Sequence, residues 1–426
     1  MANYDYDVIT VGGGIGGASI AKALAEKGLR VLVTEREESF KDRIRGEWLA
    51  PWGGAEAQML GLYDLLIEKC AHQQPYFNFG FGGFTRDLRI TTPQKLPALT
   101  FYHAAMQEVV LEAARAAGAE VRRGVTVKNV IAGKRPSVSI EGKGETRELT
   151  ARLVVCADGR SSAGRSWGEF AVKRGRQRLL GAGILLEDLA VPDDTSVSMM
   201  NPVIGRVAFL FPQGEGRVRA YLMYGEEEVG RLQGESAIGR FVAACAQTGI
   251  PAEAYAGARP AGPLASFDMT ESWVEHPYRE GLALIGDAAG SSDPTWGQGM
   301  SLTLRDARVL SSHLLTTDDW ETAGNAYAIA RARYFNAMIT TEDWTFQLFI
   351  ERGPLNDELR ARAMPLIAAD LTRVPDHGFG GVVEGCGSAS GPVRVEGLLH
   401  ARAARAWPDY TAGPAYLRAL SRLGGG

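Results

Sequence analysis

A glycine-rich turn between an apolar segment and a helix-forming segment constrains this chain more than any other feature. The apolar run at residues 8–11 leads into Gly12-x-Gly14-x-x-Gly17, and helix-forming residues follow as far as Glu26. Glycines at this spacing allow a tight turn, a close approach of the backbone to a phosphate, and close packing of helix on strand. The pattern predicts an α/β unit whose helix N-terminus faces bound phosphates.

A second apolar run, residues 29–34, ends in the acidic residue Glu35, and Arg36 follows it. A carboxylate at the end of the second strand can accept hydrogen bonds from the ribose of a dinucleotide. The order of strand, glycine turn, helix, strand and acid therefore predicts a dinucleotide site, with Glu35 and Arg36 as candidate contacts.

Length and composition exclude several classes of protein. A chain of 426 residues is long enough for two domains or for one large domain with insertions. The net charge of −4 and the lack of a Lys/Arg run disfavour a nucleic-acid partner. The four cysteines show no metal-ligand spacing, so we expect buried thiols in a reducing compartment and no metal site. No apolar run reaches the roughly 18 residues that span a bilayer, and the acidic N-terminus disfavours a secretory signal, so we expect a cytoplasmic protein.

Hydrophobic periodicity outlines the rest of the chain. A β meander is expected at residues 119–140, and a buried strand at 152–157. Glycine and serine enrichment predicts an irregular segment at 375–392. Helices are expected at 55–70, 102–117, 236–248, after 300, and at 321–370. A mostly antiparallel sheet is expected from strands at 181–186, 195–200, 206–211 and 217–224.

An alternation of aromatic and small residues marks the segment that begins at residue 75. Period two places Phe77, Phe79 and Phe81 on one face of a strand. That face packs either an ordinary core or the apolar wall of a substrate pocket, and the pattern leaves both open. Candidate polar substrate contacts on the later strands are Arg206, Tyr221 and Tyr224.

Two further glycine-containing motifs follow buried strands. Asp158 and its following glycine come directly after the strand at 152–157. Gly286 and Asp287 follow an apolar run, where a carboxylate can accept a hydrogen bond from a sugar hydroxyl. Pro294 then precedes a glycine pair that opens the next helix.

In this order the three motifs resemble the single-component, FAD-dependent aromatic hydroxylases, the para-hydroxybenzoate hydroxylase family of monooxygenases. The resemblance covers about residues 5–340. It implies an α/β, Rossmann-like FAD-binding fold of the glutathione-reductase type, with an inserted, mostly antiparallel β-sheet substrate domain and a helical C-terminal region.

The expected domains are discontinuous. They are an FAD-binding domain at 1–75, 100–180 and 277–340, a substrate domain at 76–99 and 181–276, and a helical C-terminal region with an irregular tail at 341–426.

The resemblance also implies roles for residues along the adenosine and phosphate half of FAD. The three glycines would hold the pyrophosphate and Glu35 the ribose, while Arg45 and His103 would lie beside the phosphates. Asp158 would belong to a motif that serves both FAD and NAD(P)H.

On the flavin half, Asp287 would bond the ribityl chain, with Gly286 as a further cofactor-binding residue, and Pro294 would lie beside the reactive edge of the ring. Pro294 and Gly297 thus form the predicted catalytic environment, with no acid or base assigned. A helix N-terminus at this place would stabilise negative charge on a reduced flavin. The residues expected under the pyrimidine end of the ring are Gly297, Gln298, Gly299 and Met300.

The implied function is oxygen insertion. NAD(P)H would reduce FAD, O₂ would form a flavin C4a-hydroperoxide, and an aromatic or polyketide-like small molecule would be hydroxylated. Alternatives are a flavin saturase or dehydrogenase, a halogenase, and a flavin-bound sensor. The segment Gly46-Glu-Trp-Leu-Ala-Pro51 looks like one in halogenases and geranylgeranyl-reductase-like proteins, although the halogenase Trp-x-Trp-x-Ile-Pro signature is absent. The substrate, the choice of NADH or NADPH, and the oligomeric state stay open.

Overall fold

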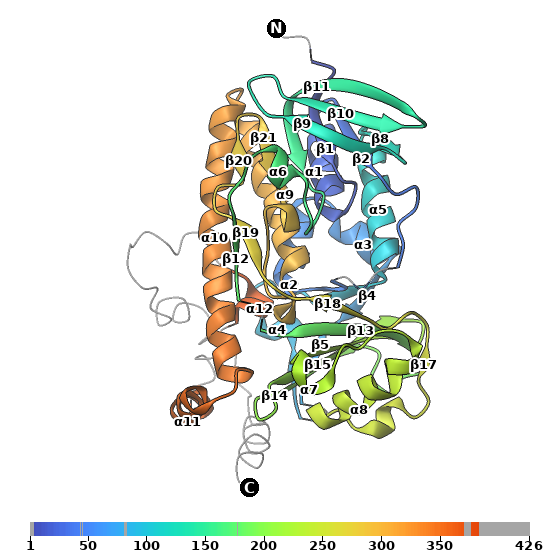
Figure 1. Cartoon of the computed structure of the whole chain (residues 1–426), viewed down its shortest axis with the longest axis vertical. Coiled ribbons are helices and arrows are strands. Elements are labelled where there is room, and N and C mark those ends of the chain that lie inside the picture. The colour runs from blue at the N-terminus through green and yellow to red at the C-terminus, as the bar shows by residue number, and fades with distance from the viewer. Residues whose placement is uncertain are drawn as a thin grey trace.

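The computed structural model describes residues 4–42, 44, 46–80, 83–176, 178–369 and 376–382. Two large β-sheets divide the molecule into halves, and the long helix α10 (Trp320–Phe349) runs along one side past both (Figure 1). The predicted residues Arg45 and Phe81, and the chain after residue 382, lie outside the described residues.

The first sheet is built around the N-terminal strand, whose inner residues Val8 and Ile9 are fully buried. Strand β1 lies between β11 and β2, and the strands from β21 to β8 are parallel. Near-continuous apolar runs are typical of parallel strands that are covered on both faces. From edge to edge the strands are β20 (Tyr278–Arg279), β21 (Leu282–Leu284), β11 (Glu145–Cys156), β1 (Tyr6–Val11), β2 (Val31–Glu35) and β8 (Glu120–Arg123).

The expected meander extends this sheet as an antiparallel ribbon, in which β9 (Thr126–Ile131) pairs with β10 (Ser137–Gly142) and β10 pairs with β11. Helix α1 (Ile15–Ala25) packs against both α5 (His103–Ala116) and α9 (Gly299–Thr316). This packing brings the first glycine motif close to the start of α9.

The second sheet is mostly antiparallel, as the alternating strands predicted, except that β14 and β5 run parallel. One face packs against α8 (Ile238–Thr248) through a separate apolar cluster. The sheet order is β17 (Arg259–Pro260), β13 (Leu180–Glu187), β16 (Arg217–Tyr224), β15 (Arg206–Gly214), β14 (Thr195–Asn201), β5 (Tyr76–Phe79) and β6 (Phe84–Asp87), with β18 (Ala265–Asp268) also on β13.

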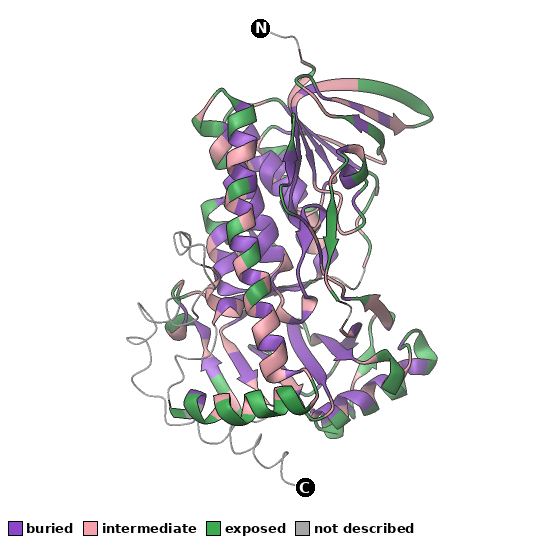
Figure 2. Ribbon diagram, turned by 60° about the vertical axis from the view of Figure 1, so that its left-hand side comes forward, coloured by how far each residue is buried: buried purple, intermediate pink, exposed green. Residues whose placement is uncertain are grey.

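Smaller elements connect the two halves, and buried residues continue through the sheets and the inner side of α10 (Figure 2). The remaining strands are β3 (Trp48–Leu49), β4 (Ala71–Gln74), β7 (Ala98–Phe101), β12 (Val172–Arg174), β19 (Ser272–Val274) and β22 (Gly290–Ser291). The remaining helices are α2 (Pro51–Met59), α3 (Tyr63–Lys69), α4 (Leu88–Thr91), α6 (Gly164–Trp167), α7 (Glu226–Val229), α11 (Pro354–Ala369) and α12 (His377–Gly380). Short 3₁₀ turns are η1 (Glu235–Ala237), η2 (Ala252–Tyr255), η3 (Gly286–Ala288) and η4 (Pro294–Trp296).

Two local predictions need correction. The helix expected at 55–70 is two helices, α2 and α3, because Gly61 between them has a φ of +64°. The segment expected to be irregular at 375–392 contains the one-turn helix α12 within its described part. Among the described helices, none is long and apolar enough to cross a membrane.

Candidate functional site

The glycine turn after β1 is too tight for a side chain at two of its three motif positions. Gly12 has a φ of +101°, and a Cβ there would stand 2.6 Å from the carbonyl oxygen of Ala157. A Cβ on Gly17 would stand 1.9 Å from the carbonyl oxygen of Gly12. No described side chain caps the start of α1, where Gly14 is the N-cap. The turn is therefore a bare backbone cradle beside a helix N-terminus, which suits a pyrophosphate.

Glu35 ends β2 directly beside this cradle. One carboxylate oxygen accepts a hydrogen bond from the amide of Gly13 at 2.8 Å, and the other accepts from the amide of Glu37 at 2.8 Å. The two amides fix the carboxylate at the rim of the turn, and its remaining lone pairs can accept from a ribose. Arg36 is mostly exposed and forms an ion pair of 3.7 Å with Glu37.

His103 begins α5, and its Nδ1 lies 2.8 Å from the carbonyl oxygen of Gly46. Asp158 turns toward its own loop: Oδ1 accepts from the hydroxyl of Ser162 at 2.6 Å, and Oδ2 accepts from the amide of Ala163 at 2.7 Å. The carboxylate of Asp158 therefore shapes the loop that follows β11, and the loop itself lines the central cavity.

Arg165 connects the region after the Asp158 motif to the Gly286–Asp287 turn. This contact was not predicted from the sequence. Its guanidinium donates to the carbonyl oxygens of Ala288 at 2.8 Å and Asp287 at 2.7 Å. Burial lowers the pKa of Arg165, and the nearby Asp287 and Asp158 carboxylates oppose the fall.

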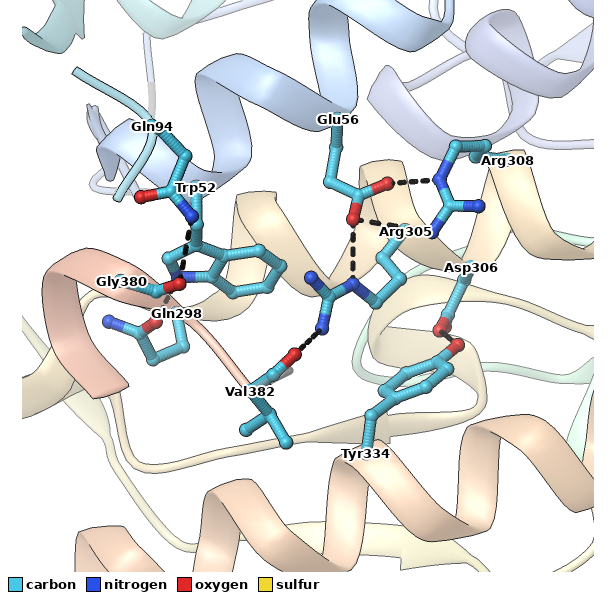
Figure 3. Close-up of polar contacts among 10 residues, drawn as sticks. All are labelled: Trp52, Glu56, Gln94, Gln298, Arg305, Asp306, Arg308, Tyr334, Gly380 and Val382. Carbon is cyan, nitrogen blue, oxygen red and sulfur yellow. Dashed lines mark hydrogen bonds and ion pairs between the residues drawn. The ribbon is translucent and has the colours of Figure 1, made fainter. Parts of the chain in front are cut away.

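A buried cluster holds the turn at Gly286 from behind. The amide of Gly286 donates to Oδ2 of Asp306 at 2.8 Å, and Nε of Arg331 donates to the same oxygen at 2.9 Å. The hydroxyl of Tyr334 donates to the other oxygen of Asp306 (Figure 3). Asp306 and Arg331 were not predicted, although a charged pair on the buried faces of two apolar helices is a usable signal.

The segment from Pro294 to Met300 forms a turn and a helix start, as expected. Asp293 caps η4 by accepting from the amide of Thr295 at 2.9 Å, and burial raises the pKa of Asp293. Gly297 lies in the left-handed region with a φ of 68°, and α9 begins at Gly299 with no capping side chain among the described residues. The uncapped helix start leaves backbone N–H groups for an electron-rich ligand atom.

The side chain of Gln298 serves the protein interior. Its Oε1 accepts from the indole N–H of Trp52 at 2.8 Å (Figure 3), and its Nε2 donates to the carbonyl oxygens of Trp296 and Gly378. Both polar atoms of the Gln298 side chain already form hydrogen bonds within the protein. We therefore expect any cofactor contact at Gln298 to come from its backbone.

All three motifs line one continuous cavity of about 1480 Å³. Typical sites for a single drug-sized ligand enclose roughly 300–1,000 Å³, so this cavity has room for a dinucleotide and a second molecule. Of the predicted positions, the cavity lining includes Gly12, Gly14, Glu35, Arg36, His103, Asp158, Gly286, Asp287, Pro294, Gly297, Gln298, Gly299 and Met300.

An aromatic wall lies on the second sheet's side of the cavity. Phe77 and Phe79 lie on the same face of β5, with ring centroids 4.9 Å apart, and both line the cavity. Phe209 and Phe211 on β15 and Tyr221 on β16 line it from the same sheet. The Phe77 face therefore packs into the core and also lines the cavity, and its role as the wall of a substrate pocket stays a prediction.

Two predicted substrate contacts are wrong. Arg206 points to the other face of the sheet, where it donates to Gln247 at 2.8 Å and pairs with Glu228. Tyr224 also lies on that face, in the cluster under α8, and its hydroxyl accepts from the amide of Leu232 at 3.1 Å. Neither residue lines the cavity.

A buried acid was missed on the cavity side of the same strands. Glu47 forms an ion pair with Arg219 (2.6 Å from Oε2 to Nε) and accepts from the hydroxyl of Tyr221 at 2.8 Å. Burial raises the pKa of Glu47, and the guanidinium of Arg219 opposes the rise. The usable signal is the lone acid next to the apolar segment that starts at Trp48.

Comparison with known proteins identifies the fold and the cofactor. The family model described as "FAD binding domain" matches residues 5–325. Rifampicin monooxygenase of Streptomyces venezuelae is 28% identical over 75% of this chain and 66% of its own length. The chain thus spans slightly less than two thirds of that relative. Digeranylgeranylglycerophospholipid reductase of Methanocella arvoryzae is 26% identical over 78% of this chain and 82% of its own length.

Among solved structures, p-nitrophenol 4-monooxygenase PnpA of Pseudomonas putida has the same fold, with a TM-score of 0.73 and 19% identity over 86% of this chain and 94% of its own. The glutathione-reductase type of the fold and the domain boundaries stay predictions. The family match covers most of the chain and all three motifs. This chain therefore belongs to the FAD-binding-domain family, and its similarity to monooxygenases agrees with the resemblance that its motifs predicted.

Proposed function

We propose that this protein uses NAD(P)H and O₂ to hydroxylate an aromatic or polyketide-like small molecule. The observation that carries the proposal is a single cavity with two kinds of lining. The three FAD motifs form one side, and the aromatic wall with Phe77, Phe79 and Tyr221 forms another. A reactant on the aromatic wall would share one enclosed space with the flavin.

The residues of this chain bind, orient and exclude water. The glycine turn would hold the FAD pyrophosphate, and the uncapped start of α9 would face the pyrimidine end of the ring. The aromatic wall would hold a planar substrate and keep water from the reacting atoms. When bound, FAD supplies the hydride acceptor and the activation of oxygen.

The test is NAD(P)H oxidation by the purified, FAD-loaded protein against a panel of phenols, naphthols and hydroxyquinones. We expect at least one compound to accelerate NAD(P)H consumption and to gain one oxygen atom, which comes from isotopically labelled O₂. The assay is run with NADH and NADPH in parallel. Accelerated NAD(P)H consumption without an oxygenated product from any compound would contradict the proposal.

A second candidate is a flavin oxidoreductase that adds no oxygen, such as a saturase. The similarity to the archaeal reductase, which extends over 78% of this chain, favours keeping it. An assay under anaerobic conditions distinguishes the two functions. A monooxygenase forms no hydroxylated product without O₂, whereas a saturase or dehydrogenase turns over equally well.

A further inference from the structure

His377 is an unpaired polar group in the wall of the cavity. It lies on α12, is 8% exposed, and is part of the cavity lining. Neither ring nitrogen forms a hydrogen bond with any residue that the structure describes. Its ring lies 6.0 Å, centroid to centroid, from that of Trp296, in the turn that carries Pro294.

A buried imidazole without a partner is unusual, because buried side-chain polar atoms in proteins are nearly always hydrogen-bonded. Burial lowers the pKa of His377 to about 4, so the ring is neutral near pH 7. A neutral imidazole offers one N–H donor and one acceptor nitrogen. A hydroxyl group, which both donates and accepts, is complementary to either nitrogen.

Polar contacts from other parts of the chain hold the segment that carries His377, and Figure 3 shows those made by Gln94 and Arg305. Asp376 forms a two-pronged ion pair with the buried Arg86, with 3.1 Å between Nη2 and Oδ2. Three side chains then donate to backbone carbonyl oxygens of the segment. They are Gln298 to Gly378 (3.2 Å), Gln94 to Gly380 (2.9 Å) and Arg305 to Val382 (2.8 Å).

The surroundings of His377 combine apolar rings with further unpaired polar atoms. Phe379, two residues away on α12, packs edge-on against Phe77 at 4.9 Å between centroids, so α12 completes the aromatic wall. The indole N–H of Trp296 and the hydroxyl of Thr295 also lack partners among the described residues. An aromatic ring on this wall would have its polar substituent facing unpaired donors and acceptors.

We propose that His377 recognises a hydroxyl group on the aromatic substrate, so that α12 acts as a specificity element for the reaction. The inference rests on the proposed function for the nature of the substrate. It adds the residue that distinguishes a hydroxylated ring from the same ring with the hydroxyl group absent or converted to an ether.

The experiment measures binding to the FAD-loaded protein, by perturbation of the flavin absorbance, for two matched pairs: naphthol with its methyl ether, and hydroxyanthraquinone with its methyl ether. The variants are His377→Ala and His377→Gln. Glutamine retains a donor and an acceptor. His276→Ala is the control, because His276 is exposed and bonds to Asn325. FAD content and melting temperature are recorded for each protein.

In the wild type and in the His276→Ala control, we expect at least one hydroxyl compound to bind about tenfold more tightly than its ether, the effect of one added hydrogen bond. His377→Ala should bind the two members of the pair equally, with little change for the ether. His377→Gln should recover part of the preference. An equal affinity for both members in the wild type, or a preference that survives His377→Ala, overturns the inference.

The experiments distinguish a failure of the proposed function from a failure of the inference about His377. Binding that depends on His377 without an oxygenated product contradicts oxygen insertion and leaves the recognition role intact. Oxygenation that is insensitive to both His377 variants, with no hydroxyl preference, leaves the function intact and removes the role of His377.

Discussion

Gly12 and Gly118 share a φ of +101°, but only at Gly12 does a neighbour occupy the place where a Cβ would stand. The Ala157 carbonyl is 2.6 Å from that place, whereas nothing lies within 4 Å of the equivalent place at Gly118. Alanine substitutions at the two positions therefore distinguish the effect of backbone strain from the effect of a methyl group placed in the predicted phosphate-binding turn.

Gly12→Ala should lose FAD, because the new methyl group pushes apart β1 and the Asp158 loop at the pyrophosphate position. Gly118→Ala should retain FAD and lose only about 1 kcal/mol of folding free energy from strain. The measurements are the ratio of flavin to protein absorbance after gel filtration and the free energy of unfolding in urea. Equal FAD content in the two variants would contradict the prediction that the turn at Gly12 holds the FAD pyrophosphate.

On the second sheet, the face of the strand on which a residue lies separates the predicted contact that lines the cavity from the one that does not. Tyr221 and Tyr224 are three residues apart on β16, so their side chains point to opposite faces. Tyr221 lines the cavity, whereas Tyr224 packs under α8. Residue type alone suggested both, whereas alternation along the strand already excludes that both line one cavity; which of the two does so follows only from the packing of α8 on the other face.

Other residues of the site were beyond prediction because their partners are remote in sequence. Arg165 binds a carbonyl 122 positions away, and Trp52 binds Gln298 across 246 positions. The glycine motifs were predictable because a tight turn is a local property of the backbone. A side-chain contact between distant segments depends on the packing of helices and has no local pattern.

At the scale of elements, the buried cluster around Asp306 joins α9, α10 and the turn at Gly286. Asp306 on α9 is fully buried, and its main partners are the Gly286 amide, Arg331 and Tyr334, the last two on α10. Removing one partner of a buried ion pair leaves the other charge uncompensated. The predicted ribityl contact at Asp287 therefore depends on an ion pair between two helices behind it.

Asp306→Asn should lower the free energy of unfolding by about 3–5 kcal/mol and weaken FAD retention, since Arg331 keeps its charge without a full counter-ion. Urea unfolding and flavin content measure the two effects. The double variant Asp306→Asn/Arg331→Gln should recover part of the stability.

The matched control is Glu145→Gln, which breaks a surface ion pair with Arg147. Its effect should stay within about 1 kcal/mol, as for other exposed pairs. If Asp306→Asn lowers the free energy of unfolding by no more than this control, the buried cluster around Asp306 does not stabilise the turn at Gly286.

At the scale of the whole molecule, the cavity wall draws on residues from Val11 to Val382, and α12 lines it from the far end of the described chain. His377 links the docking of α12 to pH. Burial lowers its pKa from 6.5 to about 4, so the docked ring resists a proton that an undocked ring would take up. Docking is at full strength above pH 6.5 and weakens as the pH falls toward 4, by up to about 3 kcal/mol.

We expect hydrogen exchange of the amides at 376–382, corrected for intrinsic rates, to accelerate in acid relative to the amides of β1. His377→Phe should remove most of this acceleration, because a phenyl ring fills the site and takes up no proton. The Asp376–Arg86 pair is present in both proteins, so its contribution to docking cancels in the comparison. An identical pH dependence in wild type and variant would contradict the assignment to His377.

The anchoring of α12 has a consequence for how new substrate preferences arise in this scaffold. Three of the polar contacts that hold α12 and the residues after it are to backbone carbonyl oxygens, at Gly378, Gly380 and Val382, which almost any residue supplies. A substitution at His377 therefore leaves these backbone hydrogen bonds in place, whereas Phe379 also holds the helix through its contact with Phe77. If the proposed function holds, a library of substitutions at His377 could change which compounds bind, while the residues of the three glycine motifs are left untouched.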